Sequence, residues 1–472
     1  MAKKTTRKPC CPAPVTAGPT GRPSRRQFLR GAALLGGGLF LSGSLVRGLG
    51  GTANLALAAG AELADRHFIF CYFSGGWDLL LSLDPRDPAV FREDLKKVTR
   101  IQPGYHLLAS DHRSLVTTAV PSMVFGPYIG RLAQHADRLA VVRGMSMDTL
   151  THEVGRRRFI TGKPPAGLQA KGSSMATVLA AQIGNEVPIP NLSVGVESYN
   201  EDLPSYASAI RVTSVTDLVR ALKPGVATLG TAERTAVNEL LAEYRGCTES
   251  RRRARGYESN DAALDLVSRG LSATFDFAAP GMAPIRARYG MANPPDMASG
   301  EAQAAMAVSA LTSGISRVVS IEVARDIDAH GPTWASSHGP DIERGFNIIA
   351  SMIEDLAARQ YKTTSDSWLD HTTILVFSEF GRTALINSSS GRDHALTNAC
   401  VLLGAGIRGG QVLGRSSDIG MAPMASNLQT GQVESGGTII KPEHVHRALL
   451  ASVGIAEDIV DLRAQPLSAL LT

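Results

Sequence analysis

Acidic and histidine side chains cluster after hydrophobic segments typical of β-strands, and these are the residues best suited to chemistry. Each lies at or beyond the end of one of three such segments, at 67–73, 317–323 and 372–377. The carboxyl ends of parallel strands share one sheet edge, where ligands bind, so we expect the side chains to converge there. Carboxylate oxygens and imidazole nitrogens suit one or two divalent metal ions, which favours a metallohydrolase. The candidate metal ligands are Asp78, Asp326, Asp328, His330, Glu379, Asp393 and His394.

Two glycines precede the first of these carboxylates, in the segment Ser74–Asp78. Gly75 and Gly76 allow a sharp turn that would bring Asp78 close to a ligand. An aspartate that only stabilises a turn through its own side chain is the alternative. The segment Asp326–His330 is a stronger signal, because it offers two carboxylates and an imidazole within five residues.

A carboxylate and a guanidinium lie together in the segment Ser378–Arg382. Arg382 could clamp a phosphate or sulfate oxygen, because its planar guanidinium donates two parallel hydrogen bonds. A plain ion pair between Glu379 and Arg382 is the alternative. The side chains of Asp393 and His394 should point in different directions, so one can bind a metal while the other orients a ligand.

Thr151 and His152 follow a further predicted strand at 138–143. A hydroxyl beside an imidazole at a helix start could serve as a metal-activated nucleophile. An ordinary helix cap would give the same pattern. His152 and His338 are candidates for proton transfer. The candidate catalytic residues are therefore Thr151, His152, Arg382 and His338.

Strand and helix patterns alternate along the chain. Helical patterns at 301–312 and 342–358 lie between predicted strands, and the second has a clear apolar face. This alternation predicts an α/β domain over residues 59–472, with a mainly parallel central sheet and helices on both faces. The more polar range 200–295 is expected to be a helical insertion. The predicted strands cover residues 67–73, 138–143, 191–195, 317–323, 372–377 and 399–403.

One glycine-rich segment imitates a nucleotide-binding motif. Gly404–Gly409 fits the GxGxxG pattern, but Gly410–Gly414 continues as a turn into another strand instead of a helix. A dinucleotide site is therefore not expected. The sequence also lacks the GxSxG and Walker motifs of two common hydrolase classes.

Residues 1–58 have the features of a twin-arginine signal peptide. Paired arginines in Ser24–Arg30 precede a short, glycine-rich apolar stretch and small-residue cleavage sites near 56–61. Nine of the 48 Lys and Arg residues lie in this leader, and the rest of the chain has 39 basic against 43 acidic residues. The overall charge of +5 therefore indicates no nucleic-acid partner. We expect a periplasmic or secreted protein without a stable membrane span, with an uncleaved N-terminal anchor as the alternative.

Several motifs resemble the domain-of-unknown-function 1501 family. They are the twin-arginine leader, Ser-Gly-Gly-Trp-Asp (74–78), Ser-Glu-Phe-Gly-Arg-Thr (378–383), Gly-Arg-Asp-His (391–394) and Gly-Gly-Gln-Val-Leu-Gly (409–414). That family looks like a branch of the alkaline phosphatase and sulfatase superfamily. The resemblance implies an alkaline-phosphatase-like fold, divalent metals at the carboxyl edge of the sheet, and cleavage of phosphate or sulfate esters.

The resemblance also implies roles for individual residues. Asp78 resembles the first metal-binding aspartate of the superfamily, and Thr151 lies where its nucleophile would be. Asp326 and His330 resemble an Asp-x-x-x-His ligand pair, and Asp328 competes with Asp326 for that role.

Two departures from the superfamily pattern leave a choice of function open. His394 resembles the final histidine ligand, but Glu379 stands where an Asp-His pair is expected, and Thr151-His152 is not a standard nucleophile motif. We expect an exported hydrolase of phosphate or sulfate esters that uses zinc, manganese, calcium or magnesium and is exported by the twin-arginine translocase. A non-catalytic binding or envelope-assembly protein with a structural metal is the alternative. A mutase or transferase on the same scaffold is a third possibility.

Overall fold

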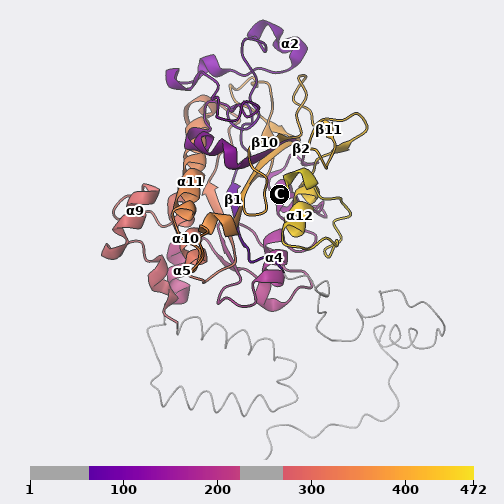
Figure 1. Cartoon of the computed structure of the whole chain (residues 1–472). Coiled ribbons are helices and arrows are strands. Elements are labelled where there is room, and N and C mark those ends of the chain that lie inside the picture. The colour runs from indigo at the N-terminus through magenta and orange to yellow at the C-terminus, as the bar shows by residue number, and fades with distance from the viewer. Residues whose placement is uncertain (1–62, 224–268) are drawn as a thin grey trace, which may run out of the picture. The chain divides into compact units, whose positions relative to one another are not determined.

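The computed structural model describes residues 63–223 and 269–472 (Figure 1). The predicted leader and the middle of the predicted insertion lie outside these ranges. Within them, the main sheet contains β1 (His67–Phe73), β2 (Leu139–Ser146), β3 (Asn191–Val194), β4 (Ile210–Val212), β5 (Val318–Ala324), β6 (Thr372–Ser378), β9 (Thr397–Gly404) and β10 (Gln411–Leu413). The order of these eight strands is β10-β2-β9-β6-β1-β5-β3-β4.

The sheet is mainly parallel. Strand β1 lies between β5 and β6 and is parallel to both, while β9 runs antiparallel to its neighbours β2 and β6. The six strands expected from the sequence are all present, and the α/β class with a mainly parallel sheet is confirmed. The segment after β9 leads into the edge strand β10 rather than a helix, in agreement with the absence of a dinucleotide motif.

Helices cover both faces of the sheet (Figure 1). Every residue of β1 is buried, because its alternate side chains face two different helical layers. Phe68, Phe70 and Tyr72 share an apolar cluster with residues of α3 (His152–Thr161), α4 (Met175–Ile183) and α12 (Pro442–Ser452). On the other face, Phe73 contacts Phe346 of α11 (Gly339–Ala357) with ring centroids 4.9 Å apart. Helix α10 (Gly300–Thr312) lies beside α11.

The range 200–295, expected to be a helical insertion, contributes to the main sheet. Strand β4 pairs in parallel with β3 and extends the sheet at this edge. Helices α5 (Val215–Leu222) and α9 (Ala283–Tyr289) are the α-helices described in this range. Residues 224–268 lie outside the described part of the chain. The described part of the range therefore contains both strand and helix.

A small two-stranded sheet at the end of the main sheet joins the 378–383 motif to the 391–394 motif. Strand β7 (Gly381–Arg382) pairs antiparallel with β8 (His394–Ala395), so Arg382 lies opposite His394. This pairing brings residues from the 378–383 and 391–394 motifs into one place. No helix in the described ranges is both long and apolar enough to cross a membrane.

Candidate metal centre

The glycine turn after β1 determines how closely the strand ends approach one another. Gly75 and Gly76 have φ angles of 122° and 81°, which favour glycine, and a Cβ on Gly75 would lie 2.7 Å from the backbone nitrogen of Ile327. The amide of Gly75 donates a 2.8 Å hydrogen bond to Oε1 of Glu379. The turn therefore contacts the loop after β5 and the end of β6 directly.

His152, the first residue of α3, is held by Glu379. The buried carboxylate accepts a 2.8 Å hydrogen bond from Nδ1 of His152 at Oε1 and a 2.9 Å bond from the Ser378 hydroxyl at Oε2. A carboxylate only accepts hydrogen bonds, so Nδ1 carries the proton. This hydrogen bond raises the pKa of His152. The other ring nitrogen, Nε2, lies 3.5 Å from Oδ2 of Asp328.

His394 is oriented in the same manner by a backbone carbonyl. Its Nδ1 lies 2.6 Å from the carbonyl oxygen of Leu150, which can only accept, so Nδ1 again carries the proton. Burial lowers the pKa of His394 and favours the neutral ring. Its Nε2 then carries a lone pair and lies 3.6 Å from Oδ1 of Asp328.

His330 completes the group. Its Nδ1 contacts Oδ1 of Asp393 at 2.8 Å, and the Nδ2 amide of Asn387 donates to the same oxygen at 3.0 Å. Nε2 of His330 lies 3.1 Å from Oδ1 of Asp328 and 2.9 Å from Nε2 of His394. Two neutral imidazole lone pairs repel at this separation, so a proton or a cation between them would stabilise the arrangement.

These four residues form what we call the histidine–aspartate cluster: His152, Asp328, His330 and His394. One potential ligand atom from each of His152, Asp328 and His394 lies within 4.8 Å of the other two. Phe380 packs against two of the rings, with centroids 4.9 Å from His152 and 4.3 Å from His394. The mixed nitrogen and oxygen donors are those of zinc and related transition-metal sites.

Arg382 is fully engaged with the protein beside this cluster. Its Nε donates to the carbonyl of Gly76 at 2.8 Å, and Nη2 donates to the carbonyl of Gly75 and to Asp328. Although burial raises the pKa of Asp328, the hydrogen bond and charge of Arg382 outweigh this and hold it below its ordinary value. Nη1 contacts the carbonyl of Arg392 at 3.2 Å. Arg382 therefore fixes the ionised form and the position of Asp328.

The structure separates Asp78 from the cluster contacts. Its buried carboxylate lies 2.8 Å from Nε of Arg392 and accepts a 2.6 Å hydrogen bond from Nε1 of Trp334. Its other oxygen accepts the amide of Leu80 at 2.8 Å. The two carboxylates that compete after β5 are both exposed, but they separate: Asp328 contacts the three histidines, whereas Asp326 lies at a turn in the backbone with a φ of 55°.

Two candidate catalytic residues make no direct contact with the cluster. Thr151 is the exposed N-cap of α3, and its hydroxyl lies 3.4 Å from that of Thr149. His338 is buried in the π-helical turn Trp334–His338, with both ring nitrogens lacking a hydrogen-bond partner. Burial lowers the pKa of His338 to about 4, so the ring is neutral. The charge of Asp78 opposes this shift of the pKa, and those of Arg382 and Arg392 add to it.

Three residues that support this region carry no obvious sequence signal of their own. Ser378 donates to Glu379, Asn387 donates to Asp393, and Arg392 pairs with Asp78. Ser378 and Arg392 lie directly beside predicted ligands in the sequence. A buried carboxylate requires a cationic or hydrogen-bonding partner, and this is the only signal that could have identified Arg392.

The fold and this cluster define an α/β protein with a candidate metal centre at the carboxyl edge of its sheet. The chain belongs to the DUF1501 family, described as "Protein of unknown function", whose model matches residues 65–451. A search of curated proteins gave no match.

Solved structures of alkaline phosphatases show distant similarity. A protein of the alkaline phosphatase superfamily from Vibrio parahaemolyticus is 8% identical with a TM-score of 0.31, and the match covers 76% of this chain and 65% of that protein. The TAB5 alkaline phosphatase, in a variant with magnesium bound in the M3 site, is 9% identical with a TM-score of 0.33. That match covers 84% of this chain and 100% of the phosphatase. A second TAB5 variant with magnesium in the same site gives a TM-score of 0.32 at the same identity and coverage.

Proposed function

We propose that the protein is an exported, metal-dependent hydrolase of phosphate or sulfate esters. The observation that supports this most directly is the orientation of the three histidines of the cluster. Each Nδ1 is held by an acceptor, at Glu379, Asp393 or the Leu150 carbonyl, and each Nε2 lies within 3.6 Å of Asp328. Hydrogen bonds of this kind fix the ring and its tautomer in metal sites.

The donor set fits one transition-metal ion better than calcium or magnesium. Three imidazoles and one carboxylate match zinc, manganese or iron, whereas calcium and magnesium prefer oxygen ligands. His152, His330, His394 and Asp328 would hold the ion. When bound, it would polarise the ester oxygen and stabilise the charge that develops during hydrolysis.

The residues around the proposed ligands would orient these ligands and assist the reaction. Glu379 fixes His152, and Arg382 fixes Asp328, because its guanidinium is already bonded to backbone carbonyls. We therefore assign Arg382 a positioning role in place of the phosphate clamp expected from the sequence. Thr151, exposed and adjacent to His152, remains the candidate nucleophile, with water as the alternative.

A non-catalytic binding protein with a structural metal is the competing proposal. It is favoured by the contacts of Thr151, whose hydroxyl has another threonine as its hydrogen-bonding neighbour and no general base. It is also favoured by the engagement of Arg382, whose five N–H groups all have partners in the protein, the fifth being Nε2 of His330 at 3.4 Å from Nη1.

Metal analysis of the purified protein tests the shared part of both proposals. We expect about one equivalent of zinc, manganese or iron, lost when Asp328 and His394 are changed to Ala. A folded protein that takes up no metal after reconstitution would contradict both proposals.

Turnover of aryl phosphates, phosphodiesters and aryl sulfates then separates the two. In an enzyme that uses the Thr151 hydroxyl, Thr151→Ala should abolish turnover and leave metal content unchanged, with Thr149→Ala as the matched control. Metal binding without turnover of any of these esters would favour the binding protein.

Export is tested by cell fractionation. Changing Arg25 and Arg26 to Lys should retain the protein in the cytoplasm, because the paired arginines are the recognition feature of this leader class. Unchanged export of this variant would contradict the twin-arginine assignment.

A further inference from the structure

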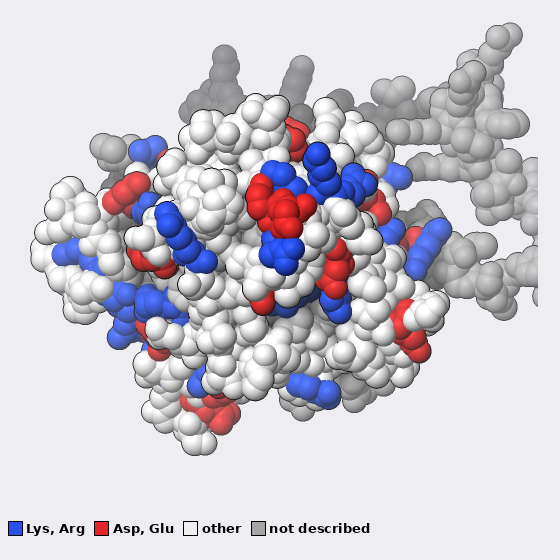
Figure 2. Space-filling view, turned by 90° about the horizontal axis from the view of Figure 1, so that it is seen from above, with Lys and Arg blue, Asp and Glu red and all other residues white. Residues whose placement is uncertain are grey.

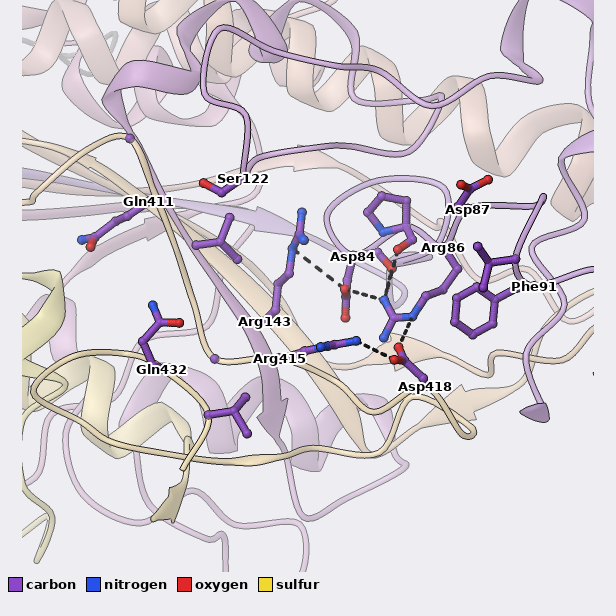
Figure 3. A pocket seen from close by; sticks show the side chains of 16 residues that line it. Asp84, Arg86, Asp87, Phe91, Ser122, Arg143, Gln411, Arg415, Asp418 and Gln432 are labelled. Carbon is purple, nitrogen blue, oxygen red and sulfur yellow. Dashed lines mark hydrogen bonds and ion pairs between the residues drawn. The ribbon is translucent and has the colours of Figure 1, made fainter. Parts of the chain in front are cut away.

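A separate cavity of about 710 Å³ lies beside β2 and β10 (Figure 3). It is lined by the loop from Asp84 to Phe91, by Arg143 of β2 and by residues around β10, and it includes no member of the histidine–aspartate cluster. A volume of this size is typical of sites for small organic molecules.

Two guanidinium groups share one buried carboxylate in this cavity. Arg86 contacts Oδ1 of Asp84 through Nη1 at 2.8 Å, and the hydroxyl of Ser416 donates to Oδ2. Nε of Arg143 lies 3.9 Å from the same carboxylate, which is too long for a hydrogen bond. Asp84 is thus hydrogen-bonded by Arg86 and Ser416, and Arg143 has this shared carboxylate only at longer range.

Arg143 is the guanidinium with the weaker share of this carboxylate. Its side chain is only 13% exposed, Nη2 donates to the Val124 carbonyl at 2.7 Å, and the buried Nε has no hydrogen-bond partner. Burial lowers the pKa of Arg143, but a guanidinium does not lose its proton at neutral pH. A buried charge whose counter-ion lies beyond hydrogen-bond distance is costly, so a bound anion would stabilise this part of the fold.

The other charged residues of the cavity do not neutralise Arg143. Arg415 and Asp418 pair with each other at the rim, where both are about half exposed, and Asp418 also contacts Arg86. The exposed Asp87 accepts the amide of Ala89. On the face shown in Figure 2, acidic and basic side chains are interspersed. Acidic and basic residues also alternate in the cavity, so a local guanidinium would attract the anion.

We propose that this cavity binds a small organic molecule through one carboxylate, sulfate or phosphate group that pairs with Arg143. The guanidinium fork suits such oxyanions, since it can donate two parallel hydrogen bonds. Phe91, Val412 and Val433 also line the cavity and would contact the apolar part of the molecule. The proposal is independent of the metal-dependent hydrolase.

Calorimetric titration of the full chain with sodium sulfate and sodium benzoate, at constant ionic strength, tests the site. We expect saturable binding with one site per chain, weakened at least about tenfold in Arg143→Met. Tighter binding of benzoate would identify a carboxylate ligand, and tighter binding of sulfate would identify a sulfate or phosphate ligand. Arg344→Met is the matched control, because Arg344 is an exposed arginine paired with Glu301 outside the cavity.

Two further variants check that the anion binds in this cavity and not at the metal centre. Val412→Phe enlarges a side chain that lines the cavity and leaves Arg143 in place, so it should also weaken benzoate binding, and the test does not depend on the folding of Arg143→Met. His394→Ala should leave binding intact, which separates this site from the metal centre. The proposal is overturned if neither anion binds, if Arg143→Met and Val412→Phe bind as the wild type does, or if His394→Ala alone removes binding.

Discussion

Glu379 governs which ring nitrogen His152 presents to the cluster. Its Oε1 accepts hydrogen bonds from both His152 and the amide of Gly75, so the carboxylate links the ring to the turn after β1. The sequence predicted Glu379 as a direct ligand. Its contacts instead indicate that it supports a ligand and sets the tautomer of that ligand.

Glu379→Gln should therefore weaken metal binding without removing a ligand. We expect a 10- to 100-fold loss of affinity, the range found for partners that orient ligating histidines. Competition with a chelator in solution measures it. Asn387→Ala removes a donor to Asp393 but no contact to a ring nitrogen, so it should change the affinity less. Equal affinities for Glu379→Gln and the wild type would contradict the supporting role.

Sequence spacing identified the residues of this region but not their individual partners. Asp326 and Asp328 are equivalent candidates in the sequence, and only the backbone of the loop, with Asp326 at a φ of 55°, decides that Asp328 reaches the histidines. Asp78 lies at a strand end as expected, yet Arg392 and Trp334 satisfy its carboxylate. Long-range pairing of this kind leaves no periodic signal.

At the scale of elements, α11 packs on β1 through a position that has no room for a side chain. A Cβ on Gly345 would lie 2.4 Å from Cε1 of Phe73 and 3.3 Å from Cβ of Ala324. Both neighbours belong to strands that end at the candidate metal centre. The close contact therefore sets how near α11 lies to these strands.

Gly345→Ala should destabilise the protein even though alanine is the better helix former. Overpacking costs about 1–3 kcal/mol, against a gain of about 1 kcal/mol from helix propensity. Chemical denaturation should show a net loss on the order of 1 kcal/mol. Gly281→Ala, where nothing lies within 4 Å of the added Cβ, should stay within about 0.5 kcal/mol of the wild type. A Gly345→Ala protein as stable as this control would contradict the tight packing.

Buried hydrophobic runs made most of the sheet predictable, because a strand covered on both faces is apolar at every position. β4 has only three residues, none of them fully buried, and so gave no such signal. The antiparallel direction of β9 is also absent from the pattern, because a fully buried strand reads the same in either direction. Its placement between β2 and β6 depends on long-range pairing.

At the scale of the whole molecule, buried neutral histidines make stability depend on pH. Burial lowers the pKa of His67 and of His446 from 6.5 to about 3 in the folded state. Both lie outside the histidine–aspartate cluster. The unfolded chain therefore binds protons that the folded chain does not between these pH values.

Stability should be highest above pH 6.5 and fall as the pH decreases towards 3. Each of these histidines contributes a slope of up to about 1.4 kcal/mol per pH unit in this window. Denaturation at several pH values should show that His446→Leu lowers the slope of the unfolding free energy against pH by the contribution of one proton. This holds whatever the variant does to stability at pH 7. The same slope in the variant and the wild type would contradict the neutral, buried state of His446.

The central strand has a consequence for how the chain folds. Phe68 of β1 pairs with Val318 and with Thr373, about 250 and 305 residues further along the chain. At about 5–20 residues per second, roughly 15–60 s of synthesis separates β1 from its last partner. During that time a seven-residue apolar strand has both edges free and can aggregate. We therefore expect newly made chains to require a chaperone that covers residues 67–73 until β6 has been synthesised.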